Sequence, residues 1–131
     1  MMLDRLRAHA EQHGVQVAID DGQNALTFAQ LCEWVDRWAS QLTARAVVAA
    51  VLPGGPELTA LGLACFSAKA VFVPLPKKAT ARELERFFSL VEPDLVATTT
   101  DRVDDVKPLL ANRPSVPCVI PKLDASADAM T

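Results

Sequence analysis

Six consecutive apolar residues, Val47 to Leu52, set the strongest limit on the fold of this chain. A strand that is covered on both faces needs such a run, whereas a half-exposed strand alternates apolar and polar side chains. Pro53-Gly54-Gly55-Pro56 ends the run at once, and Pro56 is suited to the first position of a helix. The segment therefore predicts a buried parallel strand that leads through a turn into a helix at about residues 57 to 69.

The rest of the chain alternates between helical and strand patterns. Helical patterns cover residues 2–13, 28–44, 57–69, the stretch after Thr80 and, weakly, 102–112. Strand patterns cover residues 15–20, 47–52, 71–74, 95–99 and 116–120. Asp21 to Asn24 predicts a turn, and Pro108 predicts a kink or a restart in the last helix. Because alternating strands and helices pair through right-handed crossovers, we predict an α/β fold with three layers, a mostly parallel sheet and helices on both faces.

Two of the expected helices begin with a capping box. Thr27 with Gln30, and Thr80 with Glu83, have the spacing at which a hydroxyl and a carboxylate or amide each accept a hydrogen bond from a backbone amide. Leu26 and Leu31 flank the first box. We predict that both threonines have a structural role.

Length and charge bound the class of protein. The chain has 131 residues, about one domain, and we expect a single domain over residues 1–120 followed by a polar tail or linker over 121–131. Half of the residues are hydrophobic, which is typical of a globular chain. The net charge of −3 argues against nucleic-acid binding, which needs a basic patch to displace counterions.

The same sequence bears on location. No apolar run approaches the roughly 20 residues that span a bilayer, so we expect no membrane span. The first residues are charged where a signal peptide is apolar. Cys32, Cys65 and Cys118 lie far apart in apolar stretches, as reduced, buried thiols do, and we expect a cytoplasmic protein.

Two clusters carry metal-ligating side chains. His9 and His13 share a helix face but lack a third ligand, and two solvated histidines are the favoured interpretation. Asp101, Asp104 and Asp105 follow a strand, where a charged helix start is favoured over a cation site. We therefore predict no metal site.

Two loops follow strands of the predicted sheet, at the edge where such sheets bind anions. The Pro53–Pro56 loop lacks the glycine pattern of a phosphate cradle, so a plain turn is favoured. Lys77 and Lys78 follow Pro74-Leu75-Pro76, and a solvated loop is favoured there over a phosphate contact. From the residues alone, the chain has no complete catalytic set.

Four segments resemble one enzyme superfamily in order and spacing. They are Leu26–Leu31, Val47–Glu57, Ala64–Pro76 and Glu83–Val96. Together they resemble the start of the AMP-forming adenylating enzymes, which comprise acyl- and aryl-CoA synthetases, adenylation domains of peptide synthetases, and luciferases. The resemblance covers about residues 3 to 120. Lys69 stands where the family usually has glycine, and Pro76 follows Leu75 without the usual aspartate.

The resemblance implies the N-terminal subdomain of an acyl-CoA synthetase-like fold. The family grips ATP with a glycine-rich Ser/Thr/Lys loop and orients the acyl-adenylate with a lysine, and neither motif is present in these 131 residues. No catalytic residue can therefore be assigned. The whole enzyme would use ATP and Mg²⁺, with CoA or phosphopantetheine as acceptor, whereas we expect none bound to this chain alone. Lys77 and Lys78 are candidates for contacting the CoA phosphates.

Three hypotheses follow. The first is the N-terminal portion of an AMP-forming acid–thiol ligase, which needs the remainder of the ligase or a separate subunit as its partner. The second is a non-catalytic interaction module with the same fold, and the third is an unrelated flavodoxin-like binder, which the missing phosphate loop disfavours. Because the 57–69 helix is apolar nearly all round, we predict that Leu63 and Phe66 meet another protein surface, in a homo-oligomer or a partner.

Overall fold

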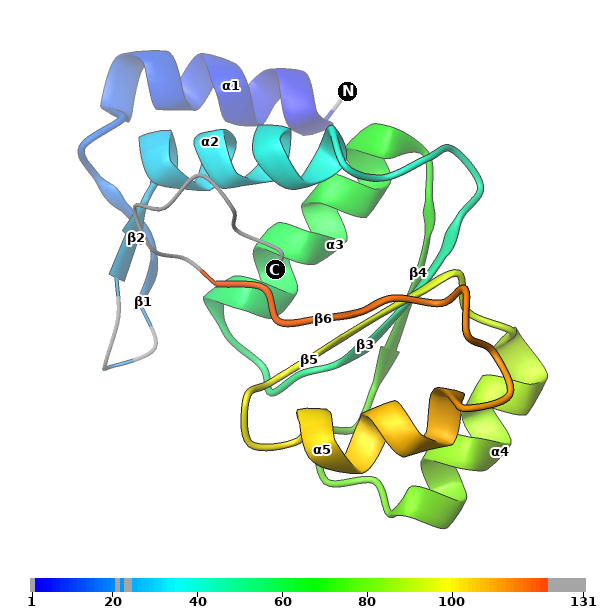
Figure 1. Cartoon of the computed structure of the whole chain (residues 1–131). Helices are drawn as coiled ribbons and strands as arrows, with labels where there is room; N and C mark the ends of the chain where they lie inside the picture. Colours follow the sequence, from blue (N-terminus) through cyan, green and yellow to red (C-terminus); the bar gives the residue numbers. More distant parts are fainter. Residues whose placement is uncertain (1, 21, 23–24, 123–131) are drawn as a thin grey trace.

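Helices and strands alternate along the chain as the sequence predicts (Figure 1). The structure, a computed structural model, describes residues 2–20, 22 and 25–122. The elements are α1 (Met2–His13), β1 (Val17–Asp20), β2 (Ala25–Thr27), α2 (Phe28–Ala39), β3 (Val47–Val51), α3 (Pro56–Ala68), β4 (Val71–Leu75), α4 (Ala81–Val91), β5 (Leu95–Thr98), α5 (Val103–Val106), the 3₁₀ turn η1 (Lys107–Leu110) and β6 (Cys118–Val119).

Four parallel strands form the main sheet in the order β4-β3-β5-β6. The apolar run forms β3, which lies inside the sheet between β4 and β5. Val47 pairs with Val71 on one side, and Val48 pairs with Leu95 on the other. Each sheet-forming segment except β6 closely matches its predicted range, and the parallel pairing is confirmed.

Helices cover both faces of this sheet, so the predicted three layers are present (Figure 1). Val48 and Ala50 of β3 point to the side of α2 and α3, where Trp38 and Leu61 are fully buried. The alternate β3 residues, Ala49 and Val51, point to the opposite side, against α4, α5 and η1. A run of six apolar residues is thus needed because the strand packs on two cores.

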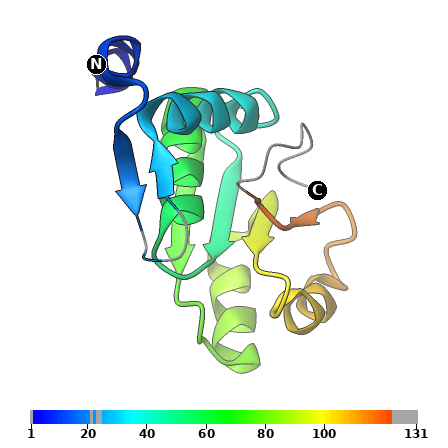
Figure 2. The same cartoon turned by 90° about the vertical axis from the view of Figure 1, so that its left-hand side faces the viewer.

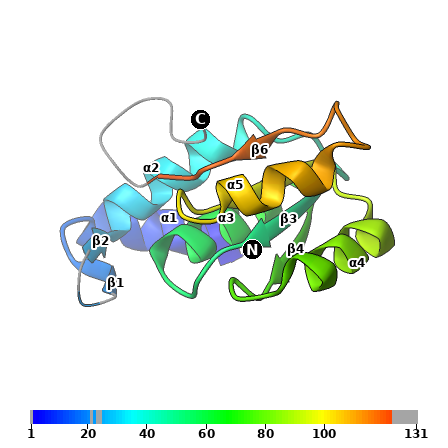
Figure 3. The same cartoon turned by 60° about the horizontal axis from the view of Figure 1, so that its bottom comes forward.

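The first strand pair departs from the prediction. β1 does not join the main sheet but pairs with β2 in a separate antiparallel sheet, with Val17 opposite Thr27 and Asp20 opposite Ala25. Figures 2 and 3 show this hairpin at the α2 side of the molecule, away from α4. The sequence analysis missed β2 because three residues carry no periodic signal, and it placed 25–27 before a helix only. Of the predicted turn, residues 21, 23 and 24 lie outside the described residues.

Both capping boxes are confirmed. The Thr27 hydroxyl accepts from the Gln30 amide at 3.2 Å, and the Gln30 side chain accepts from the Thr27 amide at 2.9 Å. Thr80 and Glu83 form the same pair of bonds at 3.1 Å and 3.0 Å. The predicted end of the first helix at residue 44 was wrong. α2 ends at Ala39 because the amides of residues 41 and 42 bond to carbonyls three residues earlier, which tightens the chain into turns.

Glycine and lysine define the two ends of α3. Gly55 has φ of 149°, which favours glycine, and Pro56 follows as the first helical residue. At the other end Lys69 is left-handed, with φ of 61°. Its amide donates to the Phe66 carbonyl and the Ala70 amide donates to the Cys65 carbonyl, which is the Schellman arrangement. The family's usual glycine at this position is explained by that backbone geometry.

The last part of the chain follows the prediction closely. α5 ends at Val106, and η1 contains Pro108, so the predicted restart is confirmed. Most of the predicted tail, 123–131, lies outside the described residues. Within the described ranges, no helix has the length and apolar character needed to cross a membrane.

Candidate functional site

The connections after β3 and β5 leave the sheet in opposite directions. β3 leads to α3 on one face, whereas its neighbour β5 leads to α5 on the other. Such a switch point, at the carboxyl ends of parallel strands, is where open α/β sheets place ligand-binding loops. The Pro53–Pro56 loop and the loop with Lys77 and Lys78 both leave the sheet at this edge, as predicted.

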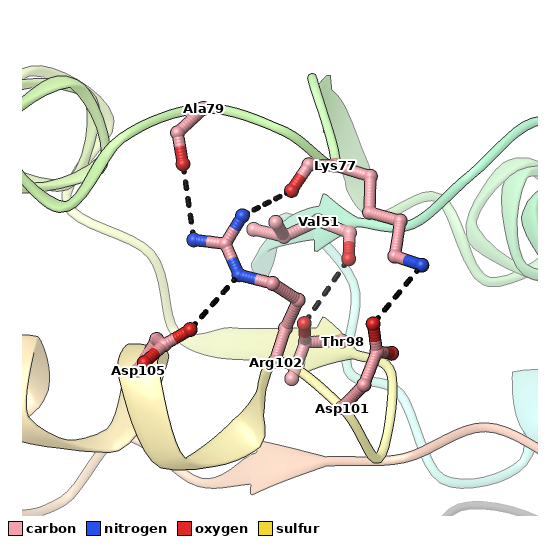
Figure 4. Close-up of polar contacts among 7 residues, drawn as sticks. All are labelled: Val51, Lys77, Ala79, Thr98, Asp101, Arg102 and Asp105. Carbon is pink, nitrogen blue, oxygen red and sulfur yellow. Dashed lines mark hydrogen bonds and ion pairs between the residues drawn. The ribbon is translucent and has the colours of Figure 1, made fainter.

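One buried hydroxyl ties the two central strands together at the switch point. The Thr98 side chain, at the end of β5, is completely buried and donates to the Val51 carbonyl of β3 at 3.1 Å. Figure 4 shows this bond below the loop that follows β4. Because an unpaired buried hydroxyl is costly, the bond fixes the rotamer of Thr98 and the separation of the strand ends.

Arg102 crosses from the β5–α5 loop to the β4–α4 loop (Figure 4). One terminal nitrogen, Nη1, donates to the Lys77 carbonyl, and the other, Nη2, donates to the Ala79 carbonyl at 3.0 Å. Its Nε lies 3.5 Å from a carboxylate oxygen of Asp105. Only 15% of the side chain is exposed. We name these three contacts the Arg102 clamp.

A second contact joins the same loops. The Lys77 ammonium lies 3.2 Å from the Asp101 carboxylate, with the lysine side chain about one-third exposed. The adjacent Thr99 hydroxyl, and then Lys77, lower the pKa of Asp101 below its ordinary value. Lys78 is exposed, and no ion pair to it is found among the described residues. The two predicted lysines therefore differ, since Lys77 is engaged within the chain and Lys78 faces solvent.

The predicted metal-ligating clusters are arranged as ordinary packing. His9 lies against His13 at 4.7 Å between ring centroids and against Phe28 at 4.3 Å. Asp101 and Asp105 each face a basic side chain rather than one another. Among the described residues no group of three His, Cys, Asp or Glu side chains is placed to hold a metal ion.

The three cysteines are free thiols, and none is close to another. Burial raises the pKa of Cys65 to about 11. Burial, aided by Asp36 and opposed by Arg7, also raises the pKa of Cys32. Burial raises the pKa of Cys118. Because the thiolate is the reactive form, these shifts favour inert thiols.

Arg102 is the residue that sequence reasoning missed. The acceptors of its clamp are main-chain carbonyls, and a carbonyl leaves no mark in the amino-acid sequence. The position was visible only as the beginning of a weak helical segment. The presence of Lys77 and Lys78 on a neighbouring loop gave no indication that an arginine holds that loop.

The family comparison decides the identity of the chain. A model of the AMP-binding enzyme family matches residues 6–131. The chain belongs to the AMP-binding enzyme family. The resemblance drawn from its four segments is therefore confirmed. Curated proteins give no match to the sequence.

Solved structures with this fold are ligases of the AMP-binding family. ATP-bound MatB from Rhodopseudomonas palustris superimposes with a TM-score of 0.75 and 23% identity over 91% of this chain. A benzoate CoA ligase from Burkholderia xenovorans gives 0.81 and 17% over 92%, and a mutant coronafacic acid ligase from Pectobacterium brasiliense gives 0.80 and 20% over 93%. The match covers only 24%, 26% and 25% of those three chains, so this chain spans about a quarter of their length.

Proposed function

We propose that this chain is the N-terminal portion of an AMP-forming acid–thiol ligase. The observation that carries the proposal is the family match over residues 6–131, supported by a fold shared with ligases over nearly the whole chain. The whole enzyme would activate a carboxylic acid with ATP and Mg²⁺. One of the similar structures, MatB, is described as ATP-bound, which supports ATP as the nucleotide.

The proposed reaction has two steps. A carboxylate oxygen of the acid attacks the α-phosphorus of ATP and displaces pyrophosphate, giving an acyl-adenylate. The thiolate of CoA or of a carrier-protein pantetheine then attacks the acyl carbon and displaces AMP. Stabilising phosphate charge needs positioned cations and amide donors, and the family's glycine-rich loop and lysine are absent from these 131 residues. We therefore expect the chain to be inactive alone.

The role of this chain is to form the sheet edge and its loops. Within the proposal, the loop carrying Lys77 and Lys78 faces the phosphates of the thiol acceptor. Lys78 is the better candidate because Lys77 is paired with Asp101. The partner is the rest of the ligase, in the same polypeptide or as a separate subunit, and the location is the cytoplasm.

Carboxylate-dependent ATP–pyrophosphate exchange tests the proposal. The assay uses a panel of acids with the 131-residue chain alone, with the product of the neighbouring gene alone, and with both together. Exchange that appears only when the two are combined supports the proposal. If no combination gives exchange with any acid while the two proteins bind each other, a non-catalytic interaction module with the same fold takes its place.

A further inference from the structure

The Arg102 clamp holds the main chain on both sides of Lys78. Its two terminal nitrogens donate to the carbonyls of Lys77 and Ala79, the residues directly before and after Lys78. Figure 4 shows the guanidinium between these carbonyls, beneath the loop. With both neighbouring carbonyls turned towards Arg102, the peptide units that carry Lys78 have a fixed orientation.

Other contacts close the remaining freedom of this loop. The Lys77 ammonium is held by Asp101, and Thr80, the next residue but one after Lys78, begins the capping box of α4. Ala79 is buried, with 4% of its surface exposed, and its amide donates to the Pro76 carbonyl at 3.1 Å. The loop is therefore fixed at each residue around Lys78, while Lys78 itself is exposed.

The guanidinium is the group suited to this task. It is planar and presents several donors in a rigid fork, so it can bond two carbonyls and a carboxylate at once. A lysine ammonium is a compact charge that cannot reproduce the fork geometry. The partial burial of Arg102 and its Asp105 contact hold the fork in place. The arrangement is a positioning device built from one side chain.

We propose that Arg102 is a positioning residue for the thiol acceptor. It orients the β4–α4 loop so that Lys78 extends from the carboxyl edge of the sheet towards a phosphate group of CoA or phosphopantetheine. The inference rests on the proposed function, because the acceptor is a substrate of the second step. It adds to that function a residue that does not touch the ligand and acts only through the main chain of Lys77 and Ala79.

Titration of the 131-residue chain by NMR tests the inference, with the backbone amides as probes. The ligands are CoA, 3′-dephospho-CoA and phosphopantetheine, which separate a contact with the 3′-phosphate from a contact with the pantetheine phosphate. The variants are Arg102→Lys, Arg102→Gln and Lys78→Ala. Arg82→Gln is the matched control, because it removes an exposed arginine from the first turn of α4, outside the clamp. Each variant is first shown to be folded by its amide spectrum and unfolding midpoint.

We expect CoA to shift the amide signals of residues 76–80. Lys78→Ala and Arg102→Lys should each weaken the affinity by about tenfold, the loss typical of a charge-assisted hydrogen bond. Arg82→Gln should bind as the unaltered chain does. A purely structural arginine would lower the unfolding midpoint and leave the CoA affinity of the folded protein unchanged. Arg102→Gln replaces the lysine variant if that variant does not fold.

Three results would overturn the inference. They are unchanged affinity in a folded Arg102 variant, equal losses in Arg82→Gln, and no binding of any of the three ligands to the unaltered chain. Pyrophosphate exchange needs no thiol acceptor, so the proposed function can hold when this inference fails. Conversely, CoA binding that depends on Arg102, in a protein that never supports exchange, would retain the site and remove the ligase function.

Discussion

Lys69 is the residue whose backbone is least suited to its side chain. It ends α3 in the left-handed region, at φ of 61°, where every residue with a Cβ atom meets steric strain. Lys69→Gly should raise the free energy of unfolding by about 1 kcal/mol, since glycine adopts this conformation without strain. Urea denaturation checks the value. Lys69→Ala removes the same charge but keeps the Cβ atom, and an equal gain in that variant would contradict the explanation by backbone strain.

The two capping threonines give a second prediction. Thr27→Ala and Thr80→Ala should each lower the free energy of unfolding by about 1 kcal/mol, because each leaves a backbone amide without its acceptor. Threonine-to-serine changes at the same positions keep the hydroxyl and serve as controls. Denaturant unfolding measures the loss, and a binding assay should show unchanged partner affinity. Loss of binding with normal stability would mean that the threonine is a contact residue.

Glu83 predicts a dependence of stability on pH. The backbone amide of Thr80, and then its hydroxyl, lower the pKa of Glu83 below its ordinary value of 4.5. A carboxylate with a lowered folded-state pKa stabilises the protein above its unfolded-state pKa, and this stabilisation is lost as the pH falls through the folded-state pKa. The unaltered chain should therefore lose more stability than Glu83→Gln between pH 7 and pH 3, measured by thermal unfolding. Glu85→Gln, an exposed change on the same helix, should follow the unaltered chain, and equal curves for all three proteins would contradict the prediction.

At the scale of elements, α3 remains the strongest candidate for an interface. Phe66 is 49% exposed and Leu63 is only partly buried, so neither is enclosed within the monomer. Phe66→Ser should weaken self-association or binding to the rest of the ligase by about tenfold, as central aromatic contacts do, and change stability little. Analytical ultracentrifugation measures the first and titration calorimetry the second. Leu90→Ser is the control, because Leu90 is an exposed leucine on α4, on the other side of the sheet. Equal effects of the two variants, or none, would remove α3 as an interface.

Elements whose signal is local were predicted from the sequence, and elements that depend on distant partners were not. β3 and β5 were evident because a strand with two buried faces is apolar throughout, and α4 because its box and stripe repeat within a few residues. β2 was missed because its three residues become a strand only by pairing with β1. At the site, the placement of Lys77 and Lys78 followed from the parallel sheet. The Asp101 contact of Lys77 and the Arg102 clamp arise from the meeting of two loops, which no local pattern encodes.

For the whole molecule, the parallel sheet and its two cores account for about a quarter of a ligase of this family. Such a piece presents loops at the carboxyl edge but lacks the residues that stabilise phosphate charge. This predicts that the pure 131-residue chain catalyses no carboxylate-dependent pyrophosphate exchange. The check is an exchange assay with the acid panel at high protein concentration. Exchange by the chain alone would mean that its own residues contain an adenylation site.

The most direct test of the ligase account is a titration at fixed concentration of the polypeptide that carries the remaining motifs. Increasing amounts of the 131-residue chain are added, and ATP–pyrophosphate exchange is measured with the preferred acid. The account predicts that exchange rises from background and reaches a plateau at one chain per polypeptide. It also predicts that Phe66→Ser shifts the curve to higher concentration. Full exchange without the added chain, or a protein complex that forms but never catalyses exchange, would contradict the claim that this chain is the N-terminal portion of a ligase.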